Sequence, residues 1–308
     1  MAYRAGIDIG GTNIKGAILG ADGEVFEESI PTGNFNKLAE TVCTLITKLC
    51  KLAHIKAGEL SGVGIGCPGM IDGAAGTVVF AGNLNLKNYP LAKRVADILK
   101  IPVKITNDAN AAALGEAKFG AGKNYDDSIF LTLGTGVGGG IIIGGKLFEG
   151  NMSAGAEIGH MVIERGGERC TCGRRGCFEA YASATALIRR TKWAMEENPG
   201  SEMWQGYTSQ TATGKTAFDY PEDIAAREVL DWYIKYLGCG IVNLANIFRP
   251  QAIILGGGVS AQGERLITPL QHLLDGEIFG GAKHARVEIV QATLGNSAGA
   301  YGAAALID

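Results

Sequence analysis

His160, Cys170, Cys172 and Cys177 form the densest group of potential metal ligands in the sequence. Three thiolates and one imidazole make a closed tetrahedral set that suits Zn²⁺, and glycines between the last two cysteines let the chain turn between ligands. Because protein atoms fill all four positions, we expect a structural zinc ion in a zinc-binding loop at residues 160–177. The alternative is three buried cysteines beside an unrelated histidine.

Two glutamates flank this loop. Glu157 stands shortly before His160, and Glu179 follows the last cysteine. An imidazole that binds a metal through one nitrogen donates its other N–H in a fixed direction. We therefore expect these three side chains to bind the hydroxyl groups of a polyhydroxylated substrate. For either glutamate the alternative is an ordinary solvated surface charge.

Three apolar strands run into glycine-rich turns. The first turn is Gly10-Gly11-Thr12, the second is Gly134-Thr135-Gly136, and the third contains Gly257 and Gly258. Glycine lets backbone N–H groups approach phosphate oxygens, since no side chain intervenes and positive φ is tolerated. We expect three backbone approaches to one phosphate-bearing ligand, with Asp8 holding a Mg²⁺-bound water near the phosphates. For a single turn the alternative is a tight hairpin.

A strand that ends in Asn107 and Asp108 leads directly into an alanine-rich segment of helical composition. Both side chains are suited to cap a helix, and capping is the alternative to a catalytic role. In the catalytic interpretation Asp108 accepts the proton of a hydroxyl group that attacks a γ-phosphate, while Asn107 orients that acceptor. Both roles are compatible if the helix begins at the floor of the pocket.

The elements that position these groups follow from hydrophobic periodicity. Two apolar strands surround the first glycine turn, and the turn signal Asp22-Gly23 extends them into a meander. Apolar residues at three- and four-residue spacing predict a helix from about Asn36 to Ala53. A strand at Val63–Gly66, a helix at Leu91–Leu99 and a strand at Val103–Ile105 follow. The first lobe is therefore predicted as βββαβαβ.

The pattern of strand, glycine turn and strand begins again near Ser128 and continues to Ile143, which indicates an internal repeat. Residues 223–248 predict a long helix before an apolar strand at 253–255. The stretch from about Asn198 to Asp219 is polar and rich in turn formers, so it predicts a loop.

Composition limits the class of protein. A chain of 308 residues exceeds the size at which one core usually keeps growing, so we expect two lobes. Hydrophobic residues at 46% and charged residues at 19% are typical of a globular protein. With a net charge of −3, the chain lacks the broad basic surface that nucleic-acid binding requires, so no nucleic-acid partner is expected.

Sequence features also predict where the protein works. The first apolar strand begins a few residues after Met1, which leaves no room for a signal peptide. No stretch approaches the roughly 20 apolar residues of a membrane helix, so no membrane partner is expected. The seven cysteines are odd in number and three of them cluster, which favours metal binding in a reducing compartment. We expect a cytoplasmic protein.

Over nearly its whole length the chain resembles the sugar kinases of the ROK family (repressor, open reading frame, kinase), and among them the bacterial glucokinases. The motifs that carry the resemblance are DIGGTN at 8–13, NDANAA at 107–112, LGTGVGGG at 133–140, EIGH at 157–160, CTCGRRGCFE at 170–179 and LGGGVS at 255–260. The cysteine motif with its glutamate is specific to the family. The glycine turns are shared with the wider superfamily of actin, hexokinase and heat-shock ATPases.

The resemblance implies an α/β, two-lobed actin-like fold of the duplicated ribonuclease H-like type. The small lobe is expected at residues 1–107, with a C-terminal helix at about 299–308 packed back on it, and the larger lobe at 108–298. It implies Asp108 as the general base, and as sugar-binding residues Gly69, Asn83, Asn107, Asp108, Glu157, His160 and Glu179. The nucleotide-binding residues that it implies are Asp8, Gly10, Gly11, Thr12, Asn13, Lys15, Gly134, Thr135, Gly136, Gly257 and Gly258.

The activity implied by the resemblance is ATP- and Mg²⁺-dependent phosphorylation of glucose to glucose 6-phosphate. Kinases for mannose, fructose, allose, N-acetylglucosamine or N-acetylmannosamine remain alternatives, because epimers differ by distances that a sequence does not fix. Polyphosphate as the phosphoryl donor also remains open. A sugar-sensing regulator is the alternative from another functional class, and a homodimer or homotetramer is the expected assembly.

Overall fold

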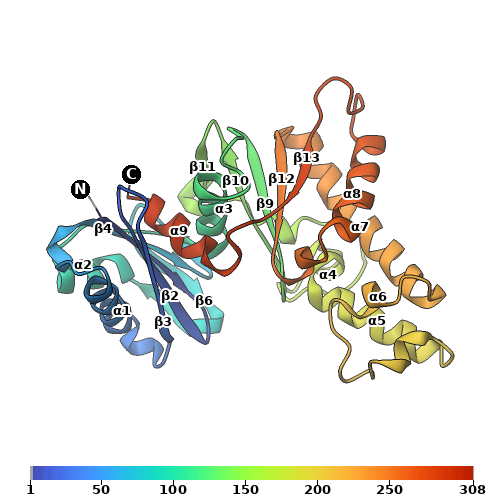
Figure 1. Cartoon of the computed structure of the whole chain (residues 1–308), viewed down its shortest axis with the longest axis horizontal. Coiled ribbons are helices and arrows are strands. Elements are labelled where there is room, and N and C mark those ends of the chain that lie inside the picture. The colour runs from blue at the N-terminus through green and yellow to red at the C-terminus, as the bar shows by residue number, and fades with distance from the viewer. Residues whose placement is uncertain (1–2, 308) are drawn as a thin grey trace. The chain divides into compact units, whose positions relative to one another are not determined.

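The computed structural model describes residues 3–307 (Figure 1). By compactness the chain divides into two units. Unit 1 comprises Met1–Phe130, Gly140–Ala156 and Thr293–Asp308, and unit 2 comprises Leu131–Gly139 and Glu157–Ala292. The lobe boundary between residues 107 and 108 stays a prediction.

Unit 1 contains the strands and helices expected near the N-terminus. Its elements are β1 (Tyr3–Ile9), β2 (Asn13–Leu19), β3 (Val25–Pro31), α1 (Leu38–Leu52), β4 (Leu60–Cys67), β5 (Met70–Asp72), β6 (Thr77–Ala81), β7 (Leu86–Tyr89), α2 (Leu91–Leu99), β8 (Val103–Asn107), α3 (Asp108–Phe119), β11 (Lys146–Phe148) and α9 (Ala298–Ala305). The order β1, β2, β3, α1, β4, α2, β8 matches the predicted βββαβαβ. The small antiparallel sheet β5-β6-β7 was not predicted, because its strands are short and carry no alternating pattern.

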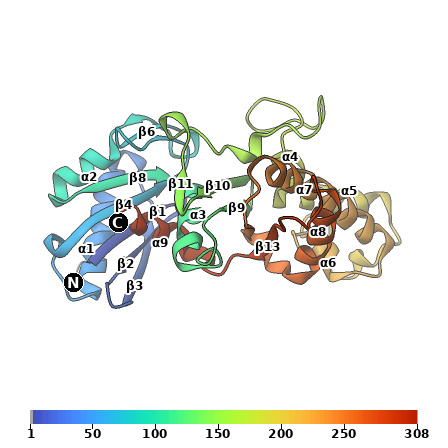
Figure 2. The ribbon, with the colours of Figure 1, turned by 90° about the horizontal axis from the view of Figure 1, so that it is seen from above.

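The first sheet has the order β3-β2-β1-β4-β8, and helices α1 and α9 pack against it. Ile7 and Ile65 lie side by side in β1 and β4, and both belong to the core that α1 completes. One residue earlier Gly6 pairs with Gly64, on the opposite face. A Cβ on Gly64 would lie 1.6 Å from the carbonyl oxygen of Ala303, so only glycine lets α9 approach the sheet this closely. Figures 1 and 2 both show α9 beside α3.

Unit 2 is mainly helical around the remaining strands. Its elements are α4 (Glu179–Ala182), α5 (Ala184–Glu197), α6 (Thr216–Asp219), α7 (Ile224–Phe248), β12 (Ala252–Gly256), α8 (Glu264–Glu277) and β13 (Glu288–Gln291), while β9 (Ser128–Leu133) and β10 (Val137–Ile143) extend across the unit boundaries. The second sheet has the order β11-β10-β9-β12-β13. Numbered from their own first strands, both sheets read 3-2-1-4-5, which agrees with the repeat seen in the sequence.

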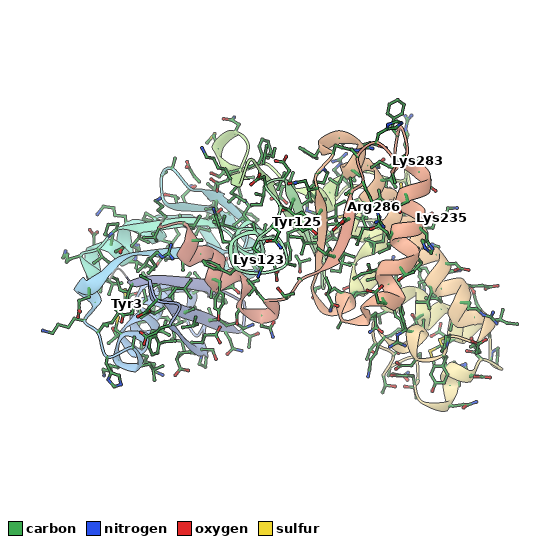
Figure 3. The ribbon with its side chains drawn as sticks, turned by 45° about the horizontal axis from the view of Figure 1, so that its top comes forward. Tyr3, Lys123, Tyr125, Lys235, Lys283 and Arg286 are labelled. Carbon is green, nitrogen blue, oxygen red and sulfur yellow. The ribbon has the colours of Figure 1, made fainter. Side chains whose placement is uncertain are left out.

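Helix α8 covers the outer edge of β13. The side chain of Gln271 donates to the carbonyl oxygen of Val287 (3.0 Å) and accepts from the N–H of Ile289 (2.8 Å). Arg286, which is labelled in Figure 3, pairs with Asp275 of α8 at 3.6 Å. An amide side chain thus occupies backbone groups that an added strand would otherwise bind.

The polar stretch from 198 to 219 is more ordered than a loop. It contains a 3₁₀ helix at Glu202–Gln205 and the short helix α6. Met203 is fully buried, and Asp223 accepts hydrogen bonds from the N–H groups of both Glu202 (2.7 Å) and Ala226 (2.8 Å). The cap of α7 therefore also anchors this segment, a contact that local composition does not reveal. No helix within residues 3–307 is long and apolar enough to span a membrane.

A buried carboxylate ties α3 to the segment that leads into α9. Glu116 is fully buried and accepts hydrogen bonds from the N–H groups of Ala121 (2.8 Å), Thr293 (3.2 Å) and Leu294 (2.8 Å). A Cβ on Gly120 would lie 2.0 Å from Glu116 Oε2, so glycine makes room for the carboxylate. One side chain thus joins chain segments almost 180 residues apart.

We expect Glu116→Gln to lower the free energy of unfolding by about 2–4 kcal/mol. The amide keeps one acceptor oxygen and turns its NH₂ toward backbone donors, which leaves buried groups unsatisfied. Urea unfolding of both proteins at one pH measures the difference. Glu228→Gln, on an exposed part of α7, is the control and should change stability by less than about 0.5 kcal/mol. An equally small effect at Glu116 would contradict this role.

Candidate functional site

A backbone hydrogen bond closes the first glycine turn, and Thr32, directly after β3, binds the turn from outside. The N–H of Gly10 donates to the carbonyl oxygen of Asn13 (3.0 Å). Thr32 donates its hydroxyl to the carbonyl oxygen of Gly10 (2.7 Å) and its N–H to that of Thr12 (2.9 Å). Sequence reasoning missed Thr32, which lies outside any motif and reaches the turn only because β2 pairs with β3. Gly11 and Thr12 remain exposed.

Asp8 and Lys15 lie opposite each other in β1 and β2, next to the first turn. The carboxylate of Asp8 also lies against α9, where a Cβ on Gly299 would come within 2.6 Å of its Cγ. Burial and the nearby charge of Asp108 raise the pKa of Asp8 to about 6, while Lys15 opposes the shift. Burial also raises the pKa of Asp108, and hydrogen bonding from the N–H of Ala109 opposes it. Two acidic groups of unit 1 therefore influence each other electrostatically.

At the start of α3, Asn107 caps the helix, which leaves Asp108 available for the predicted catalytic role. Asn107 is the N-cap, since its Oδ1 accepts from the N–H groups of Ala109 (2.8 Å) and Asn110 (3.3 Å). Its Nδ2 donates to the carbonyl oxygen of Gly69 (3.1 Å), so two predicted sugar-binding residues are in contact. Asp108 is the first helical residue, and it is not needed as the cap.

Gly69 and Asn83 belong to the same part of unit 1. Gly69 has φ = +103°, and a Cβ there would lie 2.3 Å from the carbonyl oxygen of Phe80 in β6. Asn83 is exposed and follows β6 in the 3₁₀ turn Gly82–Leu84. A positive φ and a close backbone contact both explain the glycine at 69.

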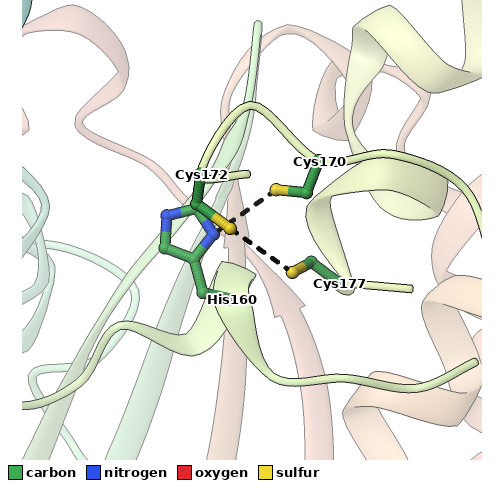
Figure 4. Close-up of side chains that lie close together, drawn as sticks. All are labelled: His160, Cys170, Cys172 and Cys177. Atoms are coloured by element: carbon green, nitrogen blue, oxygen red, sulfur yellow. Dashed lines mark hydrogen bonds between the residues drawn. The ribbon is translucent and has the colours of Figure 1, made fainter. Parts of the chain in front are cut away.

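The four predicted metal ligands converge within unit 2. The ligand atoms of His160, Cys170, Cys172 and Cys177 all lie within 4.8 Å of one another. The Nδ1 of His160 is 3.6 Å from the sulfur of Cys170, and the sulfurs of Cys172 and Cys177 are 3.7 Å apart (Figure 4). With Zn–S bonds of about 2.3 Å, two sulfurs of a tetrahedral site lie about 3.8 Å apart. The donor set and its spacing therefore fit a zinc ion.

Glu179 connects this loop to the second glycine turn. Its Oε1 accepts from the hydroxyl of Thr171 (2.9 Å), and its Oε2 accepts from the N–H of Val137 (3.2 Å). A Cβ on Gly136 would lie 2.1 Å from Oε2, so a side chain at this position would displace the Glu179 carboxylate. Glu157 precedes the 3₁₀ helix Ile158–His160 and is exposed.

The third glycine turn lies against the end of β9. Gly257 has φ = +82°, and a Cβ there would come within 2.6 Å of the backbone of Leu133, at the end of β9. Gly258 faces open space. In unit 2 this brings the third turn next to the strand that leads into Gly134.

The predicted site residues thus form two groups, each assembled within its own unit. Unit 1 holds Asp8, Gly10, Gly11, Thr12, Asn13, Lys15, Gly69, Asn83, Asn107 and Asp108. Unit 2 holds Gly134, Thr135, Gly136, Glu157, His160, Cys170, Cys172, Cys177, Glu179, Gly257 and Gly258. Their roles in binding and catalysis stay predictions.

The raised pKa of Asp8 predicts a pH-dependent gain in stability for Asp8→Asn. Between the ordinary value of 3.8 and about 6, the folded state binds more protons at Asp8 than the unfolded state does. The contribution of this carboxyl to stability therefore falls as pH rises through that window. In buffer without magnesium, we expect the variant to be about 2 kcal/mol more stable at pH 7.5 and less than about 1 kcal/mol more stable at pH 4.5.

Urea unfolding at the two pH values measures this difference. Asp231→Asn, on an exposed part of α7, serves as the control and should show no comparable pH-dependent gain. A gain for Asp8→Asn that is equal at both pH values would contradict burial of the charge as its cause.

The chain matches a known protein family over nearly its whole length. The model of the ROK family matches residues 4–308. A glucokinase of Halalkalibacterium halodurans is 37% identical, over 99% of this chain and 94% of that protein. The xylose repressor of Bacillus subtilis is 29% identical, over 99% of this chain and 77% of the repressor.

The structural match gives the fold class. The ROK family glucokinase of Streptomyces griseus, solved in complex with glucose and AMPPNP, superimposes with a TM-score of 0.81 at 34% identity and covers 99% of both chains. This confirms the predicted α/β actin-like fold class. From the family match and the sequence identity, we conclude that the chain belongs to the ROK family.

Proposed function

We propose that this protein is a glucokinase, which transfers the γ-phosphoryl group of ATP to the 6-hydroxyl of glucose. The observation that carries the proposal is the full-length similarity to glucokinases, with Asp108 directly after Asn107 at the start of α3. The complex of the Streptomyces griseus glucokinase with glucose and AMPPNP supports both substrates.

In the proposed reaction, Asp108 accepts the proton of the glucose 6-hydroxyl as its oxygen attacks the γ-phosphorus. The new O–P bond forms in line with the bond to the leaving oxygen of ADP. Asn107, Gly69 and Asn83 in unit 1 orient the sugar, together with Glu157 and Glu179. Burial that raises the pKa of Asp108 supports this role, because a stronger base accepts the proton more readily.

Phosphate binding is assigned to the glycine turns. Backbone N–H groups of residues 10–12 and 134–136 approach the phosphates, and Gly257 with Gly258 lies near the adenosine. Asn13 and Lys15 complete the first turn, and Asp8 is suited to hold a water bound to Mg²⁺. When bound, Mg²⁺ neutralises the charge that develops on the phosphoryl oxygens.

We assign the zinc-binding loop a structural Zn²⁺ bound by His160, Cys170, Cys172 and Cys177, since their separations fit tetrahedral coordination. Such an ion keeps the loop folded. It also fixes the His160 ring, so that the nitrogen not bound to the metal is directed at a sugar hydroxyl.

Three further features belong to the proposal. We place the small lobe at residues 1–107 with the C-terminal helix, and the larger lobe at 108–298, with closure around the substrates expelling water. We also propose a homodimer or homotetramer that works in the cytoplasm. The repressor relatives favour a sugar-sensing regulator as the second candidate function.

A coupled assay of ADP release tests the proposal. The protein is given ATP and Mg²⁺ with glucose, mannose, fructose, allose, N-acetylglucosamine or N-acetylmannosamine, and sugars are ranked by kcat/KM. We expect the highest value for glucose. A clear preference for another sugar would keep the mechanism and replace the substrate. Turnover of none of them, with sugar binding retained, would support the regulator instead.

A further inference from the structure

The first turn of α5 holds the backbone of the second glycine turn (residues 134–136). The N–H of Ala184 donates to the carbonyl oxygen of Gly134 at 2.8 Å. The hydroxyl of Thr185 donates to the carbonyl oxygen of Thr135, also at 2.8 Å. A helix leaves its first N–H groups without partners inside the helix, so the bond from Ala184 comes from the geometry of a helix end. The bond from Thr185 depends on its side chain.

These two bonds set the direction of the backbone N–H groups that follow. In a trans peptide the C=O and the next N–H point in opposite directions. With the carbonyls of Gly134 and Thr135 held toward α5, the N–H groups of Thr135 and Gly136 point away from it. Two successive N–H groups on one side of a turn make a concave site for an anion.

The other side of the turn is confined as well. The carboxylate of Glu179 accepts from the N–H of Val137, and the carbonyl oxygen of Val137 faces Gly159, where a Cβ would lie 2.0 Å away. Motifs on both sides of the zinc-binding loop therefore contact Val137, the residue directly after the turn. Between these contacts, the hydrogen bond from the Thr185 hydroxyl sets the orientation of the Thr135–Gly136 peptide.

We propose that Thr185 is a positioning residue for nucleotide binding. Its hydroxyl fixes the Thr135–Gly136 peptide so that the N–H of Gly136 meets a phosphate oxygen of ATP or ADP. The inference rests on the proposed function, because it takes the second turn as the phosphate-binding one. Thr185 is exposed, and its side-chain hydrogen bond goes to Thr135, which is not among the proposed sugar-binding residues. A substitution of Thr185 should therefore change nucleotide binding and leave sugar binding unchanged.

The test replaces the hydroxyl while keeping the shape of the side chain. In Thr185→Val, we expect MgADP to bind about fivefold more weakly in calorimetry and KM for ATP to rise by a similar factor, as for one lost hydrogen bond. KM for glucose should stay within about twofold, because the sugar is bound by other residues. Thr185→Ser keeps the hydroxyl and should restore most of the affinity for MgADP.

Thr44→Val is the matched control. Thr44 is also exposed on a helix and donates its hydroxyl to a backbone carbonyl, that of Glu40 (2.9 Å), but both residues of this bond lie in α1 and neither belongs to a glycine turn. It should leave MgADP binding unchanged. Equal MgADP affinity of Thr185→Val and wild-type protein would overturn the inference, even if the variant were less stable. A rise in the KM values of ATP and glucose by the same factor would also overturn it.

These measurements separate the inference from the proposed function. If wild-type protein binds MgADP but phosphorylates none of the sugars, the proposed function is wrong. The comparison of MgADP affinities among the Thr185 variants still decides the inference. If wild-type protein binds no MgADP, both are wrong.

Discussion

Replacing Asp108 by asparagine is expected to lower kcat for glucose about 10³-fold, with the affinity for glucose within about threefold of wild type. The amide keeps the size of the side chain but accepts no proton, and a general base typically contributes a factor of about 10²–10⁴. Because Asn107 caps α3, the substitution leaves the helix start in place. Steady-state kinetics measure kcat, and calorimetry with glucose measures binding.

The control for this experiment is Asp97→Asn. Asp97 lies on an exposed part of α2 and forms an ion pair with Lys93, four residues earlier. It should turn over at the wild-type rate, since exposed ion pairs contribute little. If Asp108→Asn kept more than about a tenth of wild-type turnover, another group would have to be the base. If its glucose affinity fell as far as its turnover, Asp108 would be a binding residue.

Loss of the metal site is expected to have the second large effect. Purified protein should contain one zinc ion per chain by elemental analysis, and Cys177→Ser should contain less than about a tenth of that. Cys177 is fully buried, so its sulfur is held in place toward the other three ligands. We expect KM for glucose to rise at least about tenfold, because the His160 ring loses the metal ion that fixes its orientation.

The loop should also lose stability without the ion, since metal binding and folding are coupled. Cys239→Ser is the control: Cys239 is half-buried in α7, outside the cluster, and its replacement should leave zinc content and KM unchanged. Full zinc content in Cys177→Ser would contradict the ligand set. Loss of zinc with an unchanged KM for glucose would show that the metal has a structural role and does not orient His160 for sugar binding.

Glu179 links the zinc-binding loop to the backbone beside the second glycine turn, which bears on both inferences. Its two oxygens accept from Thr171 in the zinc-binding loop and from Val137, directly after the second glycine turn. A change in the loop can therefore reach the turn through a single carboxylate. For this reason the zinc experiment should record KM for ATP as well as for glucose.

Local sequence was sufficient to predict the chemical groups and most of the elements that carry them. The helix expected from about Asn36 to Ala53 is α1, at Leu38–Leu52, and the long helix at 223–248 is α7, capped by Asp223. Helical and strand periodicities repeat over a few residues, so they can be read without knowing the fold. The spacing of His160 and the three cysteines was informative for the same reason, since the ligands lie close in the chain.

Tertiary structure decided which distant groups meet. Thr32 reaches the first glycine turn through strand pairing, Glu116 reaches Thr293 across most of the sequence, and Thr185 reaches Thr135 from the start of α5. Single threonines and glutamates are common on exposed surfaces, and neither their type nor their spacing distinguishes these three. Their roles depend on how sheets and helices pack, because a hydrogen bond requires a partner within about 3 Å and the sequence does not fix that distance.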